Sequence, residues 1–223
     1  MKITRIENQK KRPGRKSIFA DGAFLIGVGT DTLIRFGLRT GDEITAGTLR
    51  RLERAEELLA ARMAALRSLA VRPRTEREIR DTLREKEFSD AVAAETIGAL
   101  KEARLLDDAL FARSFIRSAI TLRPTGRVLL RRKLLLLGVA KTTADEALDE
   151  ILEGVSQDGE ADRAALAFVS RKSARTRNLD AKGKAKLRQQ LTGYLLRRGY
   201  TWDIVAQSVK KAMKGDEGEG EEL

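Results

Sequence analysis

The sequence predicts a mainly α-helical protein of three tandem three-helix repeats, which form an elongated, curved body behind a small β-hairpin segment at the N-terminus. Three observations predict this fold. The 223 residues are 42% apolar, 35% charged and only 4% aromatic, which suits a helical protein better than a β-sandwich. Apolar side chains recur at helical spacing from about Thr45 onward. One apolar skeleton occurs three times along the chain.

The first 45 residues have the pattern of a small β-structure. Ile18-Phe19 and residues 24–28 predict two strands around Asp21-Gly22, a pair that favours a type I′ turn because both central positions need a positive φ. Residues 3–6 predict a third strand. The basic stretch 10–16 predicts a loop, and residues 31–36 predict one or two helical turns.

Helix boundaries are indicated by capping residues and prolines. Thr75-x-x-Glu78 and Thr143-x-x-Glu146 both fit a capping box at the start of a helix. Pro73 and Pro124 stand where a preceding helix has ended. Before them, a stripe at intervals of three and four residues predicts a leading helix; its members are Leu49, Leu52, Ala55, Glu56 and Leu59.

The repeat is visible as Arg72-Pro73, which recurs as Arg123-Pro124, 51 residues later. A further shift of 61 residues aligns a third copy. In the second copy the predicted helices are 109–121, 126–137 and 143–152. The aligned apolar positions are Ile79/Leu130/Leu191, Leu83/Leu134/Leu195, Phe88/Val139/Tyr200, Ile97/Leu148/Val209 and Leu100/Ile151/Ala212.

Glycines mark the turn between the last two helices of two copies. Gly138 and Gly199 hold this place in the second and third copies, whereas Glu87 holds it in the first. The sequence alone therefore does not establish a positive φ that all three copies need at this place. The predicted divisions are a β-rich segment 1–45, repeat one with its leading helix 46–107, repeat two 108–154, repeat three 155–214 and an acidic, disordered tail 215–223.

Composition excludes much catalytic chemistry. The chain has no cysteine and no histidine, which removes disulfides, thiolate nucleophiles, Cys/His zinc sites and Ser-His-Asp triads. No phosphate-binding loop of the G-x-x-x-x-G-K-[ST] type is present, and Gly27-Val28-Gly29 lacks the third glycine of a dinucleotide fingerprint. Asp107-Asp108 fits a helix cap better than a metal site. We expect no catalytic residue, no cofactor and no metal.

Charge indicates an anionic partner. The formal net charge is +11, and the last nine residues carry five acids and no base, so the rest of the chain carries +16. A face of solvated lysine and arginine is the simpler interpretation for residues 53–62, where signs alternate, and a weaker one for 182–188, which hold no acid. The side chains predicted to contact partner or DNA are Arg123, Arg127, Arg131, Arg132, Lys133, Arg171, Lys172, Lys184, Arg197 and Arg198.

Two further expectations concern surroundings and the last helix. The longest clearly apolar run, 134–140, is far shorter than the ~18–20 residues of a spanning helix, and the charged N-terminus is unlike a signal peptide. We therefore expect a cytoplasmic protein without a membrane partner, and a monomer. Trp202 is expected to open the last helix and to pack in the core or as a staple.

The chain resembles the bacterial regulatory protein RecX family, modulators of the RecA recombinase. The resemblance covers roughly residues 2–212, and its most specific part is Leu106-Asp107-Asp108 followed by Phe111-Ala112. Glu87 stands where the family has a small residue. The other matching segments are residues 72–79, 115–118, 130–139 and 195–200, with 2–6, 21–22 and 38–42 like those of longer family members.

The resemblance implies a non-enzymatic inhibitor. Such proteins bind the RecA filament on single-stranded DNA, limit its extension, and lower its ATPase and strand exchange, in recombination, DNA repair and the SOS response. A curved basic solenoid suits the groove of such a filament, with single-stranded DNA phosphates as further contacts. Two alternatives stay open: a general nucleic-acid-binding module, and a metal-dependent nuclease using Asp107 and Asp108.

Overall fold

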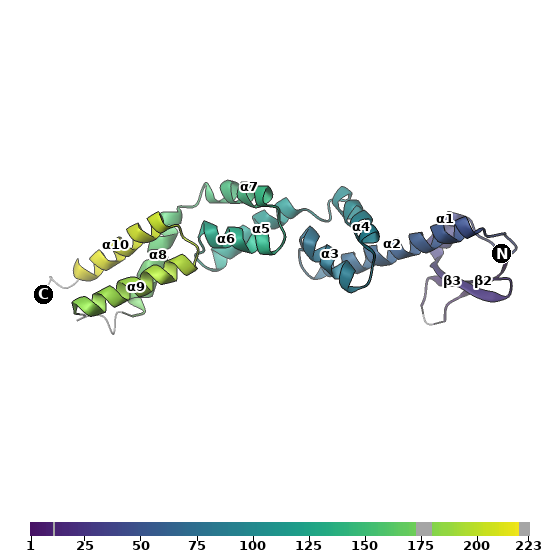
Figure 1. Ribbon diagram of the computed structural model, residues 1–223, viewed down its shortest axis with the longest axis horizontal. Coiled ribbons are helices and arrows are strands. Elements are labelled where there is room, and N and C mark those ends of the chain that lie inside the picture. The colour runs from purple at the N-terminus through teal and green to yellow at the C-terminus, as the bar shows by residue number, and fades with distance from the viewer. Residues whose placement is uncertain (11, 173–179, 219–223) are drawn as a thin grey trace. The chain divides into compact units, whose positions relative to one another are not determined.

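The computed structural model describes residues 1–10, 12–172 and 180–218, with the backbone alone for 215–218. These residues form three strands and ten helices (Figure 1). The strands are β1 (Ile3–Asn8), β2 (Arg15–Ala20) and β3 (Ala23–Gly29). The helices are α1 (Thr30–Phe36), α2 (Ala46–Val71), α3 (Glu76–Glu85), α4 (Asp90–Glu102), α5 (Asp108–Leu122), α6 (Arg127–Leu136), α7 (Lys141–Leu152), α8 (Gln157–Ser170), α9 (Ala181–Arg197) and α10 (Trp202–Gly218).

The chain divides into two compact units. The first comprises Met1–Pro73 and Ile79–Leu106, and the second comprises Arg74–Glu78 and the chain from Asp107 onward. Repeat one consists of α2, α3 and α4, repeat two of α5, α6 and α7, and repeat three of α8, α9 and α10. The mainly α fold with tandem three-helix repeats and a small N-terminal sheet is confirmed. The elongated, curved body stays a prediction.

The N-terminal sheet is antiparallel with the order β1-β2-β3. Asp21 and Gly22 both have a positive φ, of 49° and 86°, which confirms the type I′ turn. The expected basic loop is shorter than predicted, because Arg15 and Lys16 open β2 and pair with β3. Lys11, in the middle of that stretch, lies outside the described residues.

A buried carboxylate ties the sheet to α2. Glu56 belongs to the stripe of α2 that faces the core, and its side chain is 9% exposed. Its Oε1 accepts a hydrogen bond from the Gly29 amide (2.9 Å), and its Oε2 lies 2.9 Å from Nη2 of Arg15. The same Arg15 nitrogen donates to the Gly27 carbonyl (2.7 Å). The charge of Glu56 is therefore paired and hydrogen-bonded, as burial requires.

Each repeat has its own apolar core, built on the predicted skeleton. The first two skeleton positions lie on the middle helix of each repeat, and all six side chains are buried. Phe88 is partly buried where Val139 and Tyr200 are fully buried. In repeat three, α8, α9 and α10 lie side by side around this core (Figure 1). The apolar pattern that recurs in the sequence therefore corresponds to a separate apolar core in each of the three repeats.

Helix starts follow the predicted caps except at α7. In the capping box of α3, the Thr75 amide donates to Glu78 (3.1 Å) and the Glu78 amide donates to Thr75 Oγ1 (3.2 Å). The prediction that Thr143 caps α7 is wrong: the helix begins at Lys141 after Ala140. Gly138, with a φ of 90°, reverses the chain so tightly that two residues suffice before the next helix.

Repeats two and three are joined by backbone hydrogen bonds. The Gly126 amide donates to the Arg198 carbonyl (2.8 Å), and the Val128 amide donates to the Gly199 carbonyl (3.0 Å). A Cβ on Gly126 would lie 2.2 Å from the Gly199 oxygen, and one on Gly199 would lie 2.3 Å from the Leu129 nitrogen. The start of α6 and the end of α9 thus approach as closely as only glycine permits.

An equivalent joint precedes repeat two. Thr75 occupies the position of Gly126 in the repeat, and its Oγ1 donates to the Leu137 carbonyl (2.7 Å). Leu137 and Gly138 correspond to Arg198 and Gly199. A Cβ on Gly138 would lie 2.4 Å from the side chain of Arg77. The start of one middle helix therefore meets the end of the next one at both joints.

The last helix departs from prediction at its first residue. Trp202 opens α10 as expected, but its side chain is 63% exposed, so a core or staple role is wrong. Tyr200, two residues earlier, fills the core position instead. α10 continues to Gly218, into the first four residues of the predicted acidic tail, and residues 219–223 lie outside the described residues.

No helix among the described residues is both long enough and apolar enough to cross a membrane.

Candidate partner and nucleic-acid interface

The predicted arginines on one side of α6 are already paired with α7. Nη1 of Arg127 lies 2.7 Å from Oδ1 of Asp149. Arg131 contacts Asp145 in a bidentate manner: its Nε lies 2.7 Å from Oδ1 and its Nη2 lies 2.9 Å from Oδ2. Leu130 and Leu134 of the same helix are buried in the core of repeat two. These two arginines link α6 to α7 at the surface of repeat two, and each charge is paired with a carboxylate within the protein.

Arg198 is also engaged in structure. Its Nη1 donates to the Pro124 carbonyl (2.6 Å), and its guanidinium lies 4.8 Å from the centre of the Tyr194 ring. Because its own carbonyl accepts from Gly126, Arg198 bridges repeats two and three twice. The sequence predicted that Arg198 contacts a partner or DNA. In the structure its side chain and its carbonyl instead bind residues of repeat two.

Three of the four remaining predicted side chains of repeat three line two hollows. Lys172 and Arg197 line one of them with Phe168, whose ring lies 4.8 Å from the Lys172 ammonium. Lys172 also donates to Gln190 of α9. Arg171, whose Nε donates to the Ala167 carbonyl (2.9 Å), lines the other hollow together with Arg198. Lys184 is exposed on α9.

The outward face of α6 is the most unusual surface of repeat two. Val128 and Leu136 are 54% and 69% exposed, with Arg132 between them and Leu135 beside them. These four positions are spaced so that they share one side of a helix. We call them the α6 outer face. Lys133 borders it, and Arg123 is exposed just before the helix.

Comparison of the repeats sets the α6 outer face apart. The corresponding residues of repeat one are all charged: Arg77, Asp81, Arg84 and Glu85. Those of repeat three are Gln189, Gly193, Leu196 and Arg197. Only the middle repeat exposes three large apolar side chains there, and an exposed apolar patch rimmed by charge is typical of a protein-binding surface.

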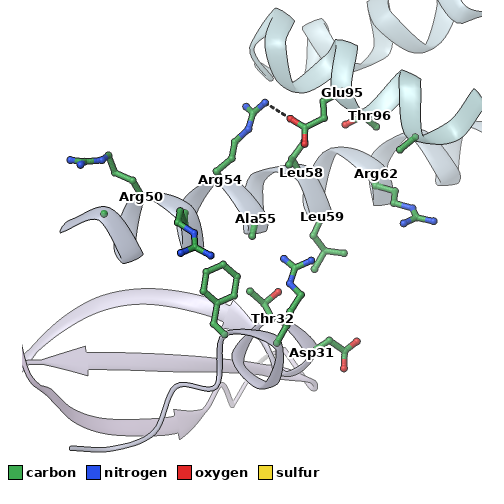
Figure 2. A pocket seen from close by; sticks show the side chains of 15 residues that line it. Asp31, Thr32, Arg50, Arg54, Ala55, Leu58, Leu59, Arg62, Glu95 and Thr96 are labelled. Carbon is green, nitrogen blue, oxygen red and sulfur yellow. Dashed lines mark hydrogen bonds and ion pairs between the residues drawn. The ribbon is translucent and has the colours of Figure 1, made fainter. Parts of the chain in front are cut away.

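A second basic surface, which the sequence did not predict as a site, lies in the first unit. Five arginines line a groove of about 680 Å³ along α2, beside α1 and α4 (Figure 2). Arg50, Arg54 and Arg62 contribute from α2 at spacings of four and eight residues. This helical spacing was the available signal, but the acids interspersed with the arginines favoured a solvated face. Arg35 of α1 and Arg51 complete the set.

Acidic side chains form no metal site among the described residues, where no group of three potential ligands comes together. Asp107 caps α5, with Oδ1 accepting from the amides of Ala109 (2.8 Å) and Leu110 (2.9 Å). Oδ1 of Asp108 accepts from the Glu76 amide (2.8 Å). Asp107 therefore caps α5, as the sequence predicted, whereas Asp108 accepts from the first amide of α3, a contact that the sequence did not predict.

Comparisons with known proteins agree with this architecture. Residues 1–45 match the regulatory protein RecX N-terminal domain, and residues 61–100 and 107–148 match the first and second three-helix domains of RecX. Regulatory protein RecX of Clostridium botulinum is 27% identical over 95% of this chain and 96% of its own length. That of Clostridium acetobutylicum is 29% identical over 94% and 95%.

A solved structure supports the same relationship. The crystal structure of a regulatory protein RecX superimposes with a TM-score of 0.72 at 27% identity, covering 94% of this chain and 98% of that one. The likeness thus extends over the N-terminal sheet and the helical repeats together. The chain belongs to the RecX family of regulatory proteins.

Proposed function

We propose that this protein regulates recombination by binding the RecA recombinase filament on single-stranded DNA, where it limits filament extension and lowers ATPase activity and strand exchange. The observation that carries the proposal is its likeness to regulatory protein RecX over nearly the whole length of both chains. The protein acts by occupying a surface. In support, the aspartates that came nearest to a metal site serve as helix caps.

We assign the contact with the recombinase to the α6 outer face. Burial of apolar surface is the dominant favourable contribution to most protein–protein association, and arginine is enriched at interfaces. Leu136 and Val128 are the exposed apolar members of this face, and Arg132 stands between them. Arg127 and Arg131, which the sequence favoured, are less suited, because binding would first break their ion pairs to α7.

The test is a titration of RecA ATPase activity on single-stranded DNA. The wild-type chain should inhibit well below equimolar stoichiometry. The variant Arg132→Gln/Leu136→Ser should need roughly tenfold more protein for half-inhibition, as expected when side chains that contribute about 1–2 kcal/mol to an interface are truncated. The matched control is Leu110→Ser/Arg117→Gln, which makes the same changes on exposed positions of α5.

Three outcomes are informative. Inhibition by the wild type and the control but not by the α6 variant supports both the function and its surface. Equal inhibition by all three proteins contradicts the α6 outer face while leaving the regulatory function intact. No inhibition by the wild type up to equimolar concentration contradicts the function itself.

A general nucleic-acid-binding module is the second candidate. The basic body and the arginine groove of the first unit favour it. It predicts tight binding to DNA without recombinase, with an affinity that falls by about 0.7 log units per log unit of salt for each single-strand phosphate neutralised. Strong inhibition of the recombinase at salt concentrations that abolish binding to naked DNA would argue against it.

A further inference from the structure

The arginine groove of the first unit has an apolar floor and a cationic rim. Ala55, Leu58 and Leu59 of α2 form part of the floor (Figure 2). Phe36 of α1 also lines the groove. Figure 2 shows Arg50 and Arg62 at opposite ends of the α2 row, with Arg54 between them. At a rise of about 1.5 Å per residue, this row extends over roughly 18 Å.

Most of the rim charge is not neutralised within the protein. Arg54 is paired with Glu95 (2.7 Å) and Glu57 (3.6 Å). The other four arginines have no carboxylate partner among the described residues. Besides Glu95, the lining holds a single acid, Asp31. The unpaired set is Arg35, Arg50, Arg51 and Arg62.

The neighbouring acids of α2 explain how this excess arises. Glu56, which follows Arg54 by two residues, is held by Arg15 and the Gly29 amide, so its charge is used against the sheet. Glu57 and Glu95 both pair with Arg54. The acids near the groove therefore leave its other four arginines without a carboxylate partner among the described residues.

The guanidinium groups at the α1 end are held in place. Those of Arg35 and Arg51 lie 5.6 and 5.8 Å from the centre of the Phe36 ring. Cation–π contacts of this kind position like charges that would otherwise repel one another. Positioned, unneutralised arginines at the edge of a groove are the arrangement that binds anions through bidentate hydrogen bonds.

We infer that this groove binds the backbone of single-stranded DNA, with phosphates on the arginine rim and unstacked bases against the apolar floor. A row of cations suits a polymer that carries one charge per unit. A duplex presents phosphates but no apolar surface to a groove of this size, since its bases stay stacked inside. An acidic protein segment shares the charge but has no flat apolar groups at every unit to cover the floor.

This inference rests on the second candidate function, nucleic-acid binding, which it deepens by naming the strand and the site in the N-terminal unit; it is independent of the proposed regulation of the recombinase. It is tested without recombinase, by fluorescence anisotropy of a labelled oligothymidylate titrated with the full chain at several salt concentrations. The test variant is Arg50→Gln/Arg62→Gln. The control is Arg39→Gln/Arg67→Gln, which removes the same charge from exposed positions of the same unit outside the groove.

The test variant should bind oligothymidylate roughly tenfold more weakly, the product of two modest ion-pair losses. Its salt slope should be smaller by about 1.4, or 0.7 for each phosphate that is no longer neutralised. The control should differ from the wild type by less than about twofold, since its arginines act only through net charge. Circular dichroism of all three proteins verifies that the fold is retained.

Other results would overturn the inference. If both variants bound oligothymidylate equally weakly, the affinity would depend on the net charge of the protein and not on the groove. An equal loss of affinity for a DNA duplex would reject the single strand as the ligand. If the test variant lost affinity for a polyglutamate peptide and kept its affinity for oligothymidylate, the groove would be a site for an acidic protein segment. Failure of the wild type to bind oligothymidylate would reject the proposal outright.

Discussion

Glu87 adopts the left-handed backbone conformation of the glycines at the same place in the other two repeats. Its φ is 64°, compared with 90° for Gly138 and 82° for Gly199. The conformation is a property of the turn and persists where the residue is unsuited to it, since a side chain costs about 1–2 kcal/mol in this region. The sequence could not predict this, because glutamate argues against a positive φ.

The variant Glu87→Gly should therefore stabilise the protein. Relief of backbone strain outweighs the greater entropy of glycine in the unfolded chain, for a net gain of up to about 1 kcal/mol. Urea unfolding monitored by circular dichroism measures the difference. A loss of stability would mean that the Glu87 side chain contributes a contact larger than its strain.

Tyr200 gives repeat three a sensitivity to alkali. Burial, and secondarily the negative charge of Glu160, raise the pKa of the Tyr200 phenol to about 12. Its hydroxyl has no hydrogen-bond partner among the described residues. Because folding raises this pKa, the folded state favours the neutral phenol. The resulting contribution to the free energy of unfolding is complete below pH 10 and is lost as the pH rises from 10 towards 12.

We predict that Tyr200→Phe keeps or slightly raises stability at pH 7, within about 1 kcal/mol, because it removes a buried hydroxyl without a partner. Above pH 10 the wild type should lose stability faster than the variant. Thermal melts between pH 8 and 11 measure both effects. Parallel declines in the two proteins would show that folding does not raise the pKa of the Tyr200 phenol.

At the scale of elements, two ion pairs link α6 to α7 beside the apolar core of repeat two. Arg131 and Asp145 are each partly exposed, so their coupling should be about 1 kcal/mol rather than that of a fully buried pair. Arg131→Asp and Asp145→Arg should each destabilise the protein, and the double exchange should recover most of the loss. A double-mutant cycle in urea measures this coupling. Additive losses would show that the pair contributes nothing.

The close approach of α6 and α9 is a second prediction at this scale. Gly126→Ala keeps an allowed φ but places a Cβ against the Gly199 carbonyl, so it should cost about 1–3 kcal/mol, as overpacking does. Gly98→Ala is the control: a Cβ there meets nothing within 4 Å, and the change should stabilise α4 by about 0.5–1 kcal/mol. Similar effects of both variants on urea unfolding would contradict the joint.

The helices could be predicted from the sequence where the spacing of buried apolar residues determines their position. The skeleton from Ile79 to Leu195 identifies the middle helices because their cores select the same positions in every repeat. The pairing of Arg127 and Arg131 was not predictable, since their partners lie on another helix. The groove was missed for a related reason: only the folded unit brings Arg35 next to α2 and pairs Glu56 with Arg15 of the sheet.

For the whole molecule, the central feature is one helical unit used three times with different surfaces. The cores and the two joints repeat, whereas the outer face of the middle helix is charged in repeat one and apolar in repeat two. The sequence predicted the repetition from its spacing. It did not reveal which outer surface is free, because that depends on ion pairs between helices. Specialised faces on a common scaffold suit a protein that binds a partner.

The most direct measurement is the extension rate of single recombinase filaments on single-stranded DNA, followed by fluorescence after the protein is added to filaments that are already nucleated. We predict that extension slows or stops at substoichiometric protein, and that Arg132→Gln/Leu136→Ser restores most of the rate. Unchanged extension at an equimolar concentration of the folded wild-type protein would contradict regulation by binding to the filament.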